Sequence, residues 1–139
     1  MTDTSDITRY VREFHEVYGC PTRETPGIDV PEVDMRLALI DEEVGELRWA
    51  LAAGDVVETA DALADIAYVV FGAALTFGID LDAVLAEVHR SNMSKLGLDG
   101  KPVYREDGKV LKGPGYFRPD VRGVLDAQDH PTESAEETA

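Results

Sequence analysis

The sequence predicts an all-α protein: an antiparallel four-helix bundle, then a short β-hairpin or loop segment and a disordered tail. Apolar residues recur at steps of three and four along four segments. Glycine follows the ends of these segments, and short turns join most of them. At 139 residues the chain is long enough for one domain with its own core. We expect this domain over residues 6–121 and an acidic, disordered tail over residues 122–139.

The first two helices are separated by a loop. The first is expected over residues 6–18, because its apolar residues share one face and Gly19 can end it. Residues 20–30 contain two prolines and a glycine, which favours a loop. Pro31 suits the first turn of a second helix, where its missing N–H costs nothing. That helix should run to Ala53 on a seam of Val33, Leu37, Ile40, Val44, Leu47 and Leu51.

The third and fourth helices follow with little intervening chain. Asp55, with Glu58 three residues later, is a capping-box-like start for a helix that reaches Phe77. Asp80 is the expected N-cap of the fourth helix, which ends near Lys95. Beyond it the helical period disappears, and residues 103–111 predict two short strands around an Asp-Gly turn.

Charge and cysteine content exclude several classes of protein. The formal net charge is −15, which argues against binding a nucleic-acid polymer, because phosphate backbones are held by Lys and Arg. Eight of the 13 basic residues nevertheless lie between Arg90 and Arg122, which suits binding of a small polyanion.

Cys20 is the single cysteine, and no signal-peptide pattern is expected at the N-terminus. The longest apolar run, residues 66–75, is too short to span a bilayer, so we expect a cytoplasmic protein without a membrane role.

Two acidic clusters are the most informative features of the chain. Glu42, Glu43 and Glu46 lie on the second expected helix, and Glu58, Asp61 and Asp65 lie on the third. Helical geometry places the second cluster within roughly 60° on one face, and Glu43 at the edge of the core. Asp65 stands in an apolar stretch, where a lone carboxylate is expensive to bury without a cation or strong donors. Oxygen ligands without nearby Cys or His predict Mg²⁺, with Mn²⁺ as a possible substitute. The alternative for Glu42, Glu46 and Glu58 is an ordinary solvated surface.

A polar run at the end of the fourth helix is the other candidate site. His89, Asn92 and Lys95 recur at steps of three and therefore share a face. They could bind phosphate, or they could simply complement the helix dipole. Aromatic side chains that could stack on a base are Phe14, His15, Tyr18, Trp49 and Tyr68, but an aromatic at helical spacing is more often core, and the nucleobase site stays unassigned.

Taken together, these motifs resemble the all-α nucleoside triphosphate pyrophosphohydrolases, the MazG-like family that includes phosphoribosyl-ATP pyrophosphohydrolase and dimeric dUTPases. Glu42-Glu43-Val-Gly-Glu46 looks like the E-E-x-x-E motif of the family. Leu63 to Tyr68, followed by Gly78-Ile79-Asp80, is similar to its second metal-binding helix. The second motif of the family is E-x-x-D. A literal match is Glu58 to Asp61, whereas counting back from Gly78 makes Asp65 its Asp and leaves Ala62 in place of the Glu.

The resemblance implies a Mg²⁺-dependent hydrolase that splits a nucleoside triphosphate between its α- and β-phosphates. It implies Glu43, Glu46, Asp61 and Asp65 as first metal ligands, and Glu42 and Glu58 as ligands of a second ion or as a base. Glu42 or Glu46 would activate the attacking water. Predicted phosphate ligands are His89, Asn92, Lys95, Lys109, Lys112 and Arg36. It also implies a homodimer or homotetramer.

Other readings of the same residues stay open. A di-iron bundle normally uses Glu-x-x-His on two helices, but Glu87 and His89 are only two residues apart. A non-catalytic acidic helical module would need neither a buried Asp65 nor a basic segment. The fold could instead act on phosphoribosyl-ATP or an alarmone rather than on dUTP, dCTP or non-canonical nucleotides in nucleotide-pool house-cleaning.

Overall fold

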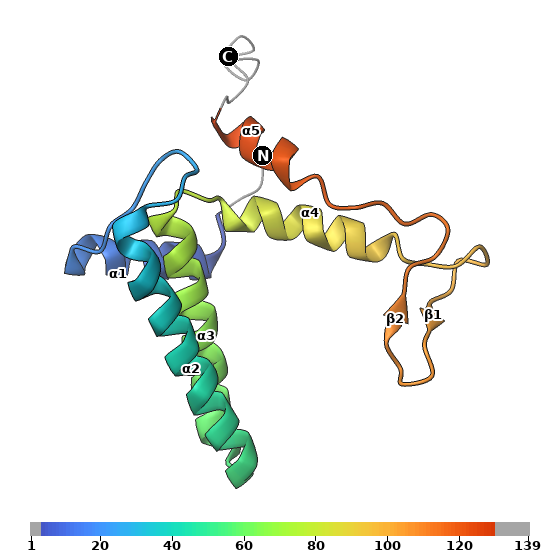
Figure 1. The fold of residues 1–139 in the computed structure, drawn as a ribbon, viewed down its shortest axis with the longest axis horizontal. Helices are drawn as coiled ribbons and strands as arrows, with labels where there is room; N and C mark the ends of the chain where they lie inside the picture. The colour runs from blue at the N-terminus through green and yellow to red at the C-terminus, as the bar shows by residue number, and fades with distance from the viewer. Residues whose placement is uncertain (1–3, 130–139) are drawn as a thin grey trace. The chain divides into compact units, whose positions relative to one another are not determined.

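A computed structural model describes residues 4–129, and over this range the chain forms five α-helices, one 3-10 helix and a two-stranded antiparallel sheet (Figure 1). The helical fold class and the hairpin are therefore confirmed. The chain divides into two compact units, one reaching Leu81 and the other beginning at Asp82.

Helix α1 (Asp6–Tyr18) opens the first unit with the predicted boundaries. The Ser5 side chain caps it by accepting a hydrogen bond from the Thr8 N–H at 3.2 Å. It ends at Gly19, whose φ of +69° is the left-handed conformation that glycine adopts without a Cβ penalty.

Helices α2 (Val33–Ala53) and α3 (Val56–Thr76) form the body of this unit and lie side by side (Figure 1). A short 3-10 helix, η1 (Val30–Glu32), precedes α2, so the predicted start at Pro31 lies in this 3-10 turn. Gly54 closes α2 at a φ of +65°. Asp55 then caps α3 by accepting from the Glu58 N–H at 3.0 Å, as the capping-box pattern predicts.

The loop after α1 is fixed to the C-terminal end of α3. The Thr76 hydroxyl donates to the Pro21 carbonyl at 2.9 Å, and the Arg23 N–H donates to the Leu75 carbonyl at 3.1 Å. At Gly78 an added Cβ would lie 2.2 Å from the Thr25 carbonyl oxygen, so the loop approaches closely because that residue is glycine.

The seam predicted for α2 is only partly buried in the single chain. Leu37 and Leu51 are 55% and 60% exposed, while Ile40, Val44 and Leu47 are half-buried. Two packed helices with α1 across one end cannot enclose a seam of this length. Leu37 and Leu51 of the predicted seam therefore stay exposed in a single chain.

The second unit contains the remaining helices and the sheet. These elements are α4 (Leu81–Met93, of which only Leu81 lies outside the unit), β1 (Val103–Tyr104), β2 (Val110–Leu111) and α5 (Val121–Asp129). The strands pair with Val103 opposite Leu111, and Gly108 in the turn has a φ of +88°. Because α4 belongs to this unit and α1 to α3 to the other, the four-helix bundle stays a prediction.

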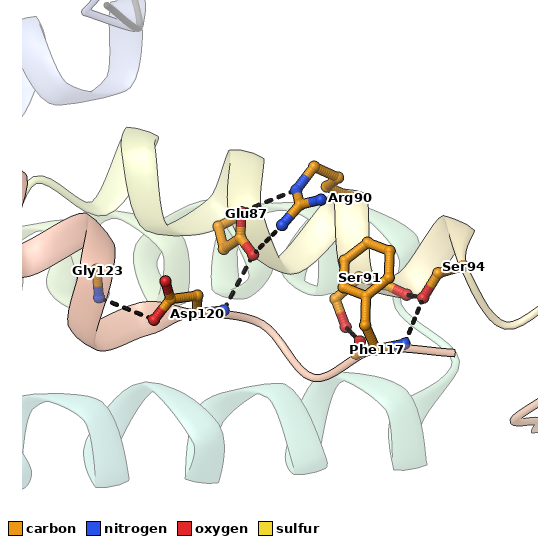
Figure 2. A network of polar contacts seen from close by, with 7 residues as sticks. All are labelled: Glu87, Arg90, Ser91, Ser94, Phe117, Asp120 and Gly123. Carbon is orange, nitrogen blue, oxygen red and sulfur yellow. Dashed lines mark hydrogen bonds and ion pairs between the residues drawn. The ribbon is translucent and has the colours of Figure 1, made fainter. Parts of the chain in front are cut away.

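A polar network attaches the C-terminal segment to α4 (Figure 2). Glu87 accepts two hydrogen bonds from the Arg90 guanidinium, at 3.0 and 2.9 Å, and a third from the Asp120 N–H at 3.0 Å. The Ser91 hydroxyl donates to the Phe117 carbonyl at 2.7 Å. This segment is therefore held by side chains more than 20 residues away in the sequence.

The expectation of a disordered tail from residue 122 is wrong for residues 122–129, which are part of α5. The Asp120 carboxylate accepts from the Gly123 N–H at 3.0 Å and so starts the helix, and Glu87 fixes Asp120 in turn. Residues 130–139 of the predicted tail lie outside the described part of the chain.

Within residues 4–129, no single helix is both long and apolar enough to cross a membrane. Only α3 and α4 taken together, across the break between them, have the necessary length and composition.

Candidate metal centre

Three of the predicted acidic ligands converge between α2 and α3. Glu43 and Glu46 lie one turn apart on α2, and Asp65 faces them from α3. Each offers a carboxylate oxygen, and these three oxygens lie within 4.8 Å of one another. Like charges this close repel unless a proton or a cation intervenes. The cluster is thus built either to hold a proton or to bind a cation.

Glu43 is the least satisfied member of this group. Its side chain is half-buried, and its Oε2 is the one fully buried side-chain oxygen or nitrogen without a hydrogen-bond partner among the described residues. Burial raises the pKa of Glu43 from an ordinary 4.5 to about 7, with further contributions from contact with the Glu46 carboxyl and the charge of Asp65. A buried acceptor without a donor costs free energy, which a bound cation would offset.

Asp65 shows the same effect on the other helix. Burial raises its pKa, and the charges of Asp61 and Glu46 raise it further. Asp61 itself is exposed and stands outside the group of three, within electrostatic reach of it. The structure therefore brings together three of the four predicted first ligands.

Glu42 and Glu58 lie at the border of the site. Glu42 is exposed, although its charge contributes to the raised pKa of Glu43. Glu58 is also exposed, and it lines an open cavity of about 410 Å³ together with Glu46, Trp49 and Ala62. The small side chain of Ala62 leaves this space beside the carboxylates free.

The donor set fits a hard divalent cation. All three converging groups supply carboxylate oxygens, and no His or Cys joins them among the described residues. Magnesium and manganese prefer such ligands, and magnesium commonly takes one or two carboxylates while keeping other positions for substrate and water. The unpartnered Glu43 Oε2 supplies the physical reason for a ligand at this place.

The predicted phosphate ligands lie, with one exception, in the second unit. His89, Lys109 and Lys112 are exposed, and the Lys112 ammonium stands over the Tyr116 ring at 4.9 Å. Asn92 and Lys95 line one cavity of about 360 Å³, whose other walls include Tyr104. Their role in binding phosphate stays a prediction.

Arg36 is the exception: it lies in the first unit, on α2 about two turns before Glu43, and is not a member of the acidic group. It is buried, and its guanidinium donates to the Glu32 carboxylate at 3.3 Å. An added Cβ at Gly72 would lie 3.7 Å from Arg36 and 3.2 Å from the buried His15 ring, so the small residue there makes room for both side chains. This arrangement is sufficient to explain Arg36 as an internal ion pair.

The aromatic candidates separate into different environments. His15 is buried and its Nδ1 donates a hydrogen bond to the Pro21 carbonyl at 3.2 Å, whereas Trp49 is 80% exposed. Phe14, Tyr18 and Tyr68 share one cleft. Glu13 also lines this cleft and was not among the residues predicted from the sequence. A usable signal was its spacing of three from Tyr10 and four from Val17, which puts the three residues on one stripe of α1.

Comparison with known proteins places this site in a family. Residues 11–92 match the sequence profile described as phosphoribosyl-ATP pyrophosphohydrolase. An uncharacterized protein of Acanthamoeba polyphaga mimivirus is 34% identical over an alignment of 123 residues, and the match covers 81% of this chain and 45% of that protein. The chain thus spans less than half the length of this relative.

A solved structure gives a weaker likeness. It is the crystal structure of a protein from Exiguobacterium sp. 255-15, provisionally named an NTP pyrophosphohydrolase, and it is 24% identical over 99% of this chain and 100% of that one. Its TM-score to this chain is 0.49. The profile match covers more than half of the chain, from α1 through the acidic clusters to Asn92. The chain therefore belongs to the phosphoribosyl-ATP pyrophosphohydrolase family, whose members are hydrolases acting on phosphoric anhydrides.

Proposed function

We propose that this protein is a Mg²⁺-dependent nucleoside triphosphate pyrophosphohydrolase. It cleaves a ribo- or deoxyribonucleoside triphosphate between the α- and β-phosphates and releases the monophosphate and pyrophosphate. Membership of the family supports the reaction type. The observation that carries the proposal is the buried Glu43 Oε2, which lacks a partner inside a group of three carboxylates.

In this proposal Glu43, Glu46 and Asp65 hold the cation, with Asp61 beside them. When bound, a divalent cation withdraws charge from the phosphate oxygens while the anhydride bond breaks. Glu46 or Glu42 orients the attacking water and accepts its proton on a carboxylate oxygen, and pyrophosphate is the leaving group. Glu42 is suited to orienting the water and accepting its proton, because its carboxylate is exposed.

The basic residues supply the complementary charge. We propose that Asn92 and Lys95 bind the pyrophosphate side of the substrate, with Lys109 and Lys112 as further cations. Support comes from the cavity that Asn92 and Lys95 share. Lys ammonium groups stabilise phosphoryl oxygens most strongly where water is excluded.

Assembly and location are part of the same proposal. We propose a homodimer or homotetramer, because Leu37, Leu51 and Trp49 expose apolar surface on the body of the first unit. We also propose a cytoplasmic location, for which the lone Cys20 gives modest support.

The nature of the substrate has two main candidates. Nucleotide-pool house-cleaning, with dUTP, dCTP or a non-canonical nucleotide as substrate, is the first. The name of the matched family favours phosphoribosyl-ATP as the second. An alarmone is a further alternative substrate for the same reaction type. If no nucleotide is cleaved, the alternative is a non-catalytic acidic binding module.

The test is to incubate the purified protein with Mg²⁺ or Mn²⁺ and a panel of canonical and modified nucleoside triphosphates, including phosphoribosyl-ATP. Ion-exchange chromatography separates the nucleotides, and separate assays quantify pyrophosphate and orthophosphate. Monophosphate with stoichiometric pyrophosphate supports the proposal. Release of orthophosphate with a diphosphate, or no turnover with either metal, contradicts it.

A further inference from the structure

Helix α1 carries a second apolar stripe besides the one that packs inward. Val11 and His15 are buried against the rest of the first unit. Tyr10, Phe14 and Tyr18 recur at steps of four on a neighbouring face and remain 61%, 40% and 70% exposed. Exposed aromatic groups in a row usually mark a binding surface.

This stripe lines a cleft to which α3 contributes Tyr68. The cleft has a volume of about 390 Å³ and is lined by Tyr10, Glu13, Phe14, Val17, Tyr18 and Tyr68. The Phe14 ring centroid lies 4.5 Å from that of Tyr18 and 5.6 Å from that of Tyr68, the second pair meeting edge to face. The volume is in the range of small-molecule sites, and three adjoining rings offer stacking surfaces for a flat heterocycle.

One carboxylate, Glu13, lies among these rings. Glu13 is exposed, and its carboxylate forms no hydrogen bond or ion pair with the residues that the structure describes. Glu13 and Tyr68 line the same cleft. Burial raises the pKa of Tyr68, and the charge of Glu13 raises it further. An ionised carboxylate only accepts hydrogen bonds, so this cleft selects a ligand that donates.

The cleft also adjoins the acidic group along α3. Tyr68 follows Asp65 by three residues, which is less than one helical turn of about 5.4 Å. Both side chains project from adjoining parts of the same helix surface. A nucleotide whose phosphates lie at Asp65 could therefore place its base against Tyr68.

We propose that the cleft between α1 and α3 binds the nucleobase of the substrate, and that Glu13 selects bases with an exocyclic amino group. This inference rests on the proposed function and narrows its substrate class. Cytosine, adenine and guanine each present an amino donor to a carboxylate. Uracil and thymine present one N–H between two carbonyl oxygens, which a carboxylate repels. The site thus disfavours dUTP relative to dCTP.

The direct experiment compares dCTP with dUTP in the wild type and in Glu13→Gln. The readouts are kcat/KM for cleavage and, independently of turnover, calorimetric affinity for the non-hydrolysable α,β-methylene analogues with Mg²⁺. The wild type should prefer the cytosine compounds by about tenfold. Glutamine both donates and accepts, so the preference should fall to within about threefold. Glu16→Gln, an exposed residue of α1 outside the cleft, is the matched control and should keep the wild-type ratio.

A second variant tests stacking without changing the carboxylate. Tyr18→Ala should weaken the affinity for both analogues by roughly tenfold and leave their ratio unchanged. If it changes the sedimentation coefficient and leaves nucleotide affinity unaltered, the cleft is a subunit contact and the proposal is overturned.

The outcomes separate this inference from the proposed function. Selective analogue binding that depends on Glu13, without release of pyrophosphate, supports the base site and contradicts the catalytic proposal. Pyrophosphate release with a dCTP to dUTP ratio that Glu13→Gln does not change supports catalysis and overturns the base site.

Discussion

Two glutamates in similar positions on their helices have opposite surroundings. Glu43 on α2 and Glu87 on α4 are both half-buried. Glu87 accepts three hydrogen bonds, two from Arg90 and one from the Asp120 N–H, and the Arg90 interaction lowers its pKa. Glu43 meets two further carboxylates and leaves one oxygen without a partner, and burial raises its pKa to about 7.

The difference shows how a structural carboxylate can be told from a ligand. The charge of Glu87 is fully compensated by the protein, so its ionised form stabilises the fold. The charge of Glu43 is not compensated within the chain, so the folded protein tolerates it only at a cost. Such a cost is typical of a site that is completed by a ligand.

The largest effect is expected from Asp65→Asn, which removes a charge from the acidic group without changing its shape. Mg²⁺-dependent pyrophosphate release should fall by at least about 100-fold, because a neutral amide binds the cation poorly. Helical circular dichroism should be unchanged. Full activity in this variant would show that Asp65 does not bind the catalytic cation.

Glu43→Gln should stabilise the metal-free protein, because it removes a carboxylate whose charge the chain does not compensate. Without metal at pH 8, the variant should be more stable than the wild type by roughly 1 kcal/mol, a value reduced from the pKa shift because the group is partly exposed. Urea denaturation with and without Mg²⁺ measures this change. Stabilisation by Mg²⁺ should largely disappear in the variant; an undiminished Mg²⁺ effect would place the ion elsewhere.

The pH dependence of stability sharpens the same contrast. The folded-state pKa of Glu43 is raised, so its contribution to stability is lost as the pH rises from about 4.5 to about 7 in metal-free protein. The folded-state pKa of Glu87 is lowered, so its contribution is present above the unfolded pKa and is lost as the pH falls through the folded pKa. Thermal midpoints across this range should decline less steeply with rising pH in Glu43→Gln than in the wild type. Parallel curves for the two proteins would show that Glu43 does not titrate as described.

The smallest effect is expected from Glu87→Gln. Its amide cannot retain the charged pair with Arg90, so the segment that begins α5 should loosen while the first unit is unaffected. Hydrogen exchange at the Asp120 and Gly123 amides should become faster. Unchanged exchange at both amides would show that this network does not hold the segment.

Local signals predicted most element boundaries correctly. The limits of α1 and the glycines that end α1 and α2 follow from periodicity and backbone preference within a few residues. Helix α5 was missed because Asp120, which caps it, is fixed by Glu87 at a separation of 33 residues. Interactions over such a separation are not visible in a local pattern.

The site was predicted in composition more accurately than in arrangement. Helical angles grouped Asp61 with Glu58 and Asp65 on one face of α3, yet of these three only Asp65 joins Glu43 and Glu46. The relative register of α2 and α3 decides which carboxylates meet, and no single-helix calculation contains it. Phe14, Tyr18 and Tyr68 were named from the sequence as side chains that could stack on a base. The cleft that they share was not predicted, because it depends on how α1 packs against α3.

The most direct test of the central claim is Mn²⁺ binding, followed by the loss of the free-ion electron paramagnetic resonance signal at about 0.15 M salt, where weak surface binding is screened. The wild type and Glu87→Gln should bind the ion with equal affinity, and Asp65→Asn should bind it at least about tenfold more weakly. Equal binding by all three proteins would contradict the assignment of Glu43, Glu46 and Asp65 as the metal centre.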